Sequence, residues 1–60
     1  MNNQDQINSI IEKSKYNNDM VLCIEGQDER FVEVSMWNED TETEYYIQVD
    51  LQNMDVCEIN

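Results

Sequence analysis

The stretch EYYIQVDL, residues 44–51, decides the fold of this chain because apolar and polar side chains alternate along it. A period of two residues is typical of a β-strand with one buried and one exposed face. The polar side of the stretch includes Glu44 and Tyr46. The side predicted to face inward consists of Tyr45, Ile47, Val49 and Leu51.

Two further strands are predicted on the N-terminal side of this stretch. In RFVEVSMW, residues 30–37, the side chains of Val32, Val34 and Met36 alternate with those of Phe31, Glu33, Ser35 and Trp37. In MVLCIE, residues 20–25, the same alternation places Met20, Leu22 and Ile24 on one face, and Val21, Cys23 and Glu25 on the other.

The connections between these strands are short and polar. A hairpin is expected at residues 26–29, around the only glycine, and a loop at residues 38–43 (NEDTET). Residues 52–60 fit either a fourth, edge strand at 56–59 or a short helical turn, and we favour the strand.

A helix is predicted over residues 3–16. Ile7, Ile10 and Ile11 have the i, i+3, i+4 spacing of one helix face, and Asn17-Asn18-Asp19 forms a stop signal. Such a narrow apolar stripe suits a helix that covers one side of a sheet. The sequence therefore predicts one small acidic α+β domain over residues 1–60, with an N-terminal helix packed on a three- or four-stranded antiparallel sheet.

The composition excludes several functions. The chain has 14 Asp and Glu against three Lys and Arg, no His, and a formal net charge of −11. Direct nucleic-acid binding would need basic side chains, and no apolar run approaches the roughly 20 residues of a membrane-spanning helix. Catalysis that depends on His is excluded. We expect a marginally stable fold, because the acids repel one another.

Neither the cysteines nor the acids form a recognisable catalytic or metal motif. Cys23 and Cys57 lie 34 positions apart and read as free thiols in a reducing cytosol. Asp40, Glu42 and Glu44 alternate like calcium ligands but lack the glycine and the twelfth-position Glu of an EF-hand. We therefore expect no enzyme activity, no catalytic residues, no cofactor and no metal site.

One face of the predicted sheet has no helix to cover it. This face mixes aromatic residues with acids, as partner-binding surfaces do. Eight of the 14 acids also fall within residues 25–44, where only Arg30 opposes them. A charge run is usually a solvated surface, but acids kept without balancing lysines at a cost in stability favour a basic partner.

The order of helix, three strands and acidic loops, in a short chain rich in Asn and Ile, resembles that of small phage-encoded inhibitors. These include DNA-mimic inhibitors of uracil-DNA glycosylase and of restriction enzymes, and many anti-CRISPR proteins. The order of elements is similar to the N-terminal part of an anti-CRISPR that blocks the PAM-reading cleft of Cas9. That likeness covers roughly the first fifty residues as a pattern, without a shared motif, and this chain lacks the later helices, so no contact residues are carried over. The resemblance to these inhibitors implies a host nucleic-acid enzyme as the target and the bacterial cytoplasm as the location.

Two hypotheses follow. In the first, the protein is an acidic inhibitor that occupies the basic groove of a nucleic-acid-binding protein or nuclease, with carboxylates in place of phosphates. In the second, an exposed sheet face containing Val21, Phe31, Trp37 and Tyr46 forms a homodimer or binds a partner through apolar contacts. The candidate partner-binding residues of the first hypothesis are Glu33, Glu39, Asp40, Glu42 and Glu44, then Asp28 and Glu29, with Trp37 and Tyr46 as aromatic anchors.

Overall fold

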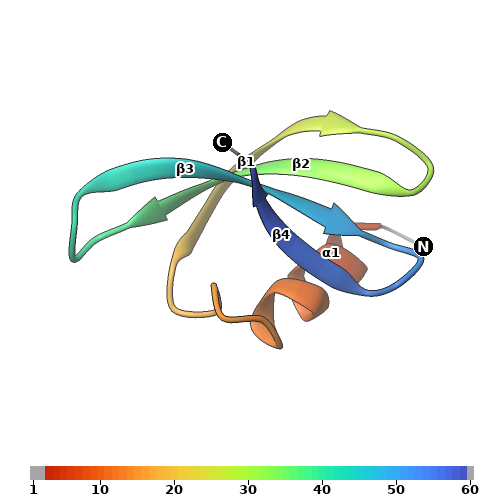
Figure 1. Ribbon diagram of the computed structural model, residues 1–60, viewed down its shortest axis with the longest axis horizontal. Coiled ribbons are helices and arrows are strands. Elements are labelled where there is room, and N and C mark those ends of the chain that lie inside the picture. Colours follow the sequence, from red (N-terminus) through yellow and green to blue (C-terminus); the bar gives the residue numbers. More distant parts are fainter. Residues whose placement is uncertain (1–2, 60) are drawn as a thin grey trace.

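The computed structural model describes residues 3–59, which form one helix and a four-stranded antiparallel sheet (Figure 1). The strands lie in the sheet in the order β1-β2-β3-β4, so each pairs with its neighbour in sequence. The predicted α+β class is confirmed, including the fourth strand. The elements are α1 (Asn3–Glu12), β1 (Met20–Gln27), β2 (Phe31–Asn38), β3 (Thr43–Asp50) and β4 (Asp55–Ile59).

The core lies between α1 and the face of the sheet that α1 covers, which we call the covered face (Figure 1). Helix α1 lies against β3 and β4. The predicted inward residues of α1, β2 and β3 are confirmed, because alternation in β2 and β3 is unbroken. The buried core consists of Ile7, Ile10, Ile11, Tyr16, Val32, Val34, Met36, Ile47 and Val49.

The helix is shorter than predicted, because it ends at Glu12 rather than at Tyr16. The Ser14 hydroxyl donates a hydrogen bond of 2.6 Å to the Ile11 carbonyl and accepts one of 3.1 Å from the Tyr16 amide. A serine side chain that bonds nearby backbone groups in this way competes with further helical turns. The chain turns after Glu12 as a result, and Tyr16 enters the core.

Strand β1 departs from the predicted alternation. Two bulges, in which Leu22 and Glu25 are the extra residues, shift its register against β2. Residues directly opposite each other in antiparallel strands share a face. Met20 pairs with Trp37 and Val21 with Met36. The predicted common face of Met20, Leu22 and Ile24 is therefore wrong, and Val21 belongs to the covered face.

The three strand connections are tight. The first spans residues 28–30, so Gly26 lies inside β1, has no positive φ and does not make the turn that we predicted around it. The second and third span residues 39–42 and 51–54. Each of these two ends on a residue in the left-handed region, Glu42 at φ 52° and Met54 at φ 55°.

Candidate partner-binding face

The side of the sheet opposite α1, which we call the open face, carries four rows of side chains. Each row follows from the strand register, because paired residues point to the same side. Strands β2 and β3 each contribute one residue to every row. From the β2–β3 loop to the opposite end, the rows are Met20–Trp37–Glu44, Cys23–Ser35–Tyr46–Ile59, Gly26–Glu33–Gln48–Cys57 and Phe31–Asp50–Asp55.

Four of the nine predicted site residues share this open face. Trp37 and Glu44 are direct neighbours in the first row, Tyr46 lies in the second and Glu33 in the third. The Tyr46 side chain is 44% exposed, whereas Trp37 is half-buried. The predicted combination of acids with aromatic side chains on one sheet face is thus present.

The other five predicted residues divide between two loops. Glu39, Asp40 and Glu42 lie in the β2–β3 loop, directly beyond the row of Trp37 and Glu44. Asp28 and Glu29 lie in the β1–β2 loop at the other end of the sheet (Figure 1). The eight residues of β2 separate the two loops by about 26 Å. The two acidic loops therefore lie at opposite ends of the sheet, and only the β2–β3 loop adjoins the row of Trp37 and Glu44.

The β2–β3 loop is held by uncharged side chains. The Asn38 side-chain oxygen accepts a hydrogen bond of 3.0 Å from the Thr41 amide, and the hydroxyls of Thr41 and Thr43 are bonded to each other. The carboxylates of Glu39, Asp40 and Glu42 are exposed. The hydrogen bonds that hold the loop therefore do not involve its carboxylates.

The negative charge of the open face changes the pKa of Tyr46, which lies on the same face. The Tyr46 hydroxyl donates to Glu44 at 3.4 Å. The charge of Glu44, followed by burial and by the charge of Glu25, raises the pKa of the Tyr46 phenol. The second row therefore lies in a field that favours positive groups.

The three basic residues do not neutralise the centre of the open face. Lys13 and Lys15 belong to the turn after α1, on the side of the sheet where the helix lies. Arg30 forms an ion pair with Asp50 at 3.2 Å, the only ion pair among residues 3–59. The Arg30 guanidinium also lies 4.9 Å from the centre of the Phe31 ring. Glu33 and Glu44 therefore face solvent without a cation.

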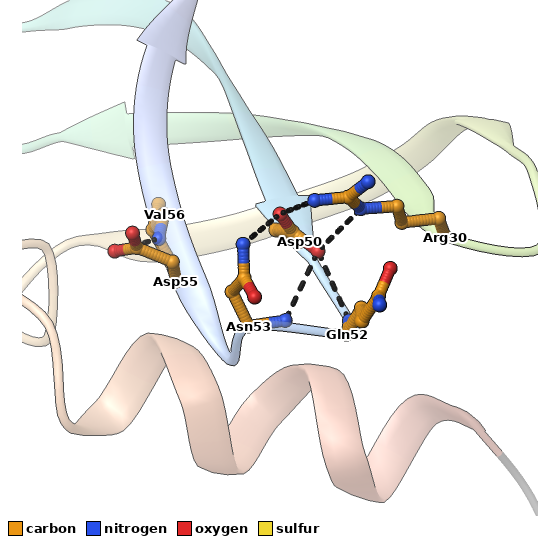
Figure 2. A network of polar contacts seen from close by, with 6 residues as sticks. All are labelled: Arg30, Asp50, Gln52, Asn53, Asp55 and Val56. Atoms are coloured by element: carbon orange, nitrogen blue, oxygen red, sulfur yellow. Dashed lines mark hydrogen bonds and ion pairs between the residues drawn. The ribbon is translucent and has the colours of Figure 1, made fainter.

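Asp50 is a functional part of the fold that we did not predict. Its carboxylate accepts bonds from the Arg30 side chain, from the amides of Gln52 and Asn53, and from the Asn53 side chain (Figure 2). The Arg30 hydrogen bond is the largest of the effects that lower the pKa of Asp50. The sequence did contain a signal for this role. An Asp at the start of a turn often accepts hydrogen bonds from backbone amides two or three residues later.

Both cysteines are free, as predicted, and both are exposed. Cys23 and Cys57 lie on the two edge strands, so three strand spacings, about 14 Å, separate them. A disulfide requires α-carbons within about 7 Å. The Cys23 thiol donates to Glu25 at 2.7 Å and lies 3.3 Å from the Ser35 hydroxyl.

A shallow hollow lies on the open face and takes one lining residue from each strand. The residues are Glu25, Glu33, Tyr46 and Ile59. Within residues 3–59, no group of three or more Cys, Asp or Glu side chains is arranged to hold a metal ion.

No helix in the described part of the chain has the length and apolar character needed to cross a membrane. Comparison with protein-family models, with curated proteins and with solved structures gives no match for this chain.

Proposed function

We propose that this protein is an acidic inhibitor whose open face and β2–β3 loop bind the basic groove with which another protein holds nucleic acid. The observation that carries the proposal is the separation of charge. On the open face, carboxylates without a cation lie beside the exposed ring of Tyr46 and the half-buried ring of Trp37, while both lysines lie on the helix side. Lys and Arg that bind phosphates also bind carboxylates with charge-assisted hydrogen bonds.

The proposed interaction has two parts. The acids of the β2–β3 loop, with Glu33 and Glu44, attract the basic groove over a distance and accelerate encounter. Tyr46 and Trp37 then provide the apolar contact that exposed ion pairs alone do not supply. Nucleic acid and the inhibitor would compete for the same side chains of the target.

The test is capture of a binding partner from a nuclease-treated lysate of a low-GC bacterium by the tagged chain. We expect a nucleic-acid-binding protein that elutes with salt and that added duplex DNA displaces, because both reagents weaken contacts to basic side chains. The variant Glu39→Gln/Asp40→Asn/Glu42→Gln/Glu44→Gln should lose this partner while keeping its fold.

A charge-matched control shows whether binding depends on the position of the acids or only on the net charge of the protein. Asp5→Asn/Glu12→Lys/Glu58→Gln also raises the net charge by four units, because the lysine substitution counts for two, but it alters neither the open face nor the β2–β3 loop. It should retain the partner. Equal losses in the two variants, or a partner that resists both salt and DNA, would contradict the proposal.

One observation favours the alternative of apolar association. Met20 and Leu22, at the start of β1, are 53% and 47% exposed. A homodimer or partner complex built on these side chains should persist or strengthen as salt rises. Sedimentation of the purified chain at low and high salt distinguishes this alternative from electrostatic binding.

A further inference from the structure

The hollow on the open face is built by the second bulge of β1. Gly26 pairs with Glu33, so strict alternation would turn the preceding residue, Glu25, to the covered face. Glu25 is instead the extra residue of the bulge and lines the hollow together with Glu33. Two carboxylates from adjacent strands thereby border one depression.

The remaining walls of the hollow are aromatic and aliphatic. Tyr46 and Ile59 are paired across β3 and β4, and Tyr46 is among the most exposed large side chains of the protein. Gly26 adds no side chain beside the hollow, and Glu33 Oε2 lies 3.8 Å from the position that a β-carbon would take there. The depression thus has an acidic side and a side suited to a flat, weakly hydrated group.

No cationic side chain of residues 3–59 occupies this position. Among the described residues, the Glu33 side chain takes part in no hydrogen bond or ion pair, and the Glu25 carboxylate accepts only the thiol hydrogen of Cys23. Arg30 is engaged by Asp50 in the fourth row. The charge of the open face is therefore complementary to a cation supplied from outside.

We infer that the hollow receives an arginine side chain of the basic partner, with the guanidinium between Glu25 and Glu33 and against the Tyr46 ring. The inference rests on the proposed function for the nature of the partner. Arginine fits better than lysine, because its planar group binds carboxylates through paired hydrogen bonds and stacks on aromatic rings. The ammonium of lysine is a compact and strongly hydrated point charge.

The experiment is an NMR titration of the ¹⁵N-labelled chain with N-acetyl-arginine amide and, separately, with N-acetyl-lysine amide. Arginine amide should shift the backbone signals of Glu25, Glu33, Tyr46 and Ile59 in a saturable manner, and lysine amide should bind several-fold more weakly. Glu33→Gln should weaken arginine binding roughly tenfold, since it removes a charge-assisted pair. Tyr46→Leu should reduce the preference for arginine over lysine.

Glu12→Gln is the matched control, because it removes one exposed acid of α1, on the opposite side of the sheet from the hollow. It should leave arginine binding within twofold of the unaltered chain, roughly the effect of one distant screened charge. Equal binding of both amides, shifts outside the hollow, or equal effects of the Glu33 and Glu12 variants would overturn the inference.

The titration needs no partner protein, so its outcome is separate from that of the capture experiment. If the chain captures a salt-eluted partner but binds both amides equally, only the inference of an arginine subsite is contradicted. If the chain prefers arginine amide but captures no nucleic-acid-binding protein, only the proposed function is contradicted.

Discussion

Ser35 illustrates how one side chain repairs an interrupted strand pair. It is 1% exposed although it lies on the open face, and its hydroxyl accepts from the Cys23 amide and donates to the Cys23 carbonyl, both at 3.2 Å. Ser35→Ala would leave two backbone groups beside the first bulge without these partners. We expect the free energy of unfolding to fall by about 1–3 kcal/mol, measured by urea denaturation.

The control for this prediction is Cys23→Ala, which removes the thiol but keeps both backbone groups and the Ser35 hydroxyl. Its effect on unfolding should stay within about 0.5 kcal/mol, as for most exposed side chains. Similar losses in the two variants would show that the thiol contact, rather than the hydroxyl, holds the bulge.

At the scale of an element, the turn between β3 and β4 depends on an ionised Asp50. Because the fold lowers the pKa of this carboxyl, its contribution to stability is fully present above the unfolded-state pKa of about 3.9. The contribution is lost as the pH falls through the lower folded-state pKa. Asp50→Asn should therefore be less stable than the unaltered chain at neutral pH, and the difference should shrink below about pH 4.

A double-mutant cycle with Arg30→Gln isolates the ion pair from the remaining turn contacts. The coupling between Arg30 and Asp50 should be measurable at neutral pH and absent once Asp50 is protonated. A coupling that does not change with pH would mean that the charge of Asp50 contributes nothing to its interaction with Arg30.

At the scale of the whole molecule, the charge of −11 acts within extents of 32 × 20 × 18 Å. At about 0.01 M salt the Debye length is roughly 30 Å, so acids at both ends repel one another. At about 0.1 M it is roughly 10 Å, which uncouples the two acidic loops. Added NaCl over this range should therefore raise Tm by about 4–8 °C, equivalent to about 1 kcal/mol.

The four-acid variant of the β2–β3 loop provides the comparison for this measurement. With four fewer negative charges it should melt higher at low salt and respond less to NaCl. A Tm that is independent of salt in the unaltered chain would show that self-repulsion is not what limits its stability.

The sequence predicts the parts of the fold in which alternation is regular. Strands β2 and β3 pair without bulges, so the side of the sheet on which Glu33, Trp37 and Tyr46 lie follows from their parity. In β1 the two bulges reverse the parity, and nothing in MVLCIE marks them. The end of the helix was missed for a local reason, because the Ser14 side chain competes for backbone groups.

The arrangement of the candidate site depends on distances along the sheet. The pattern of acids did not show that Asp28 and Glu29 lie a full strand away from Glu39, Asp40 and Glu42. The pairing of Arg30 with Asp50 joins residues 20 positions apart and follows only from the register of β2 with β3. Pairing of that kind requires the three-dimensional structure.

The strand order also sets a sequence of folding events. Each strand pairs with the next along the chain, so the hairpins involve short loops and can close within about 1–10 μs. Helix α1 is made first during synthesis but packs against β3 and β4, the last strands to emerge. The isoleucine side chains of α1 therefore stay exposed until the C-terminal half of the chain has been made. Docking of the helix then completes the fold.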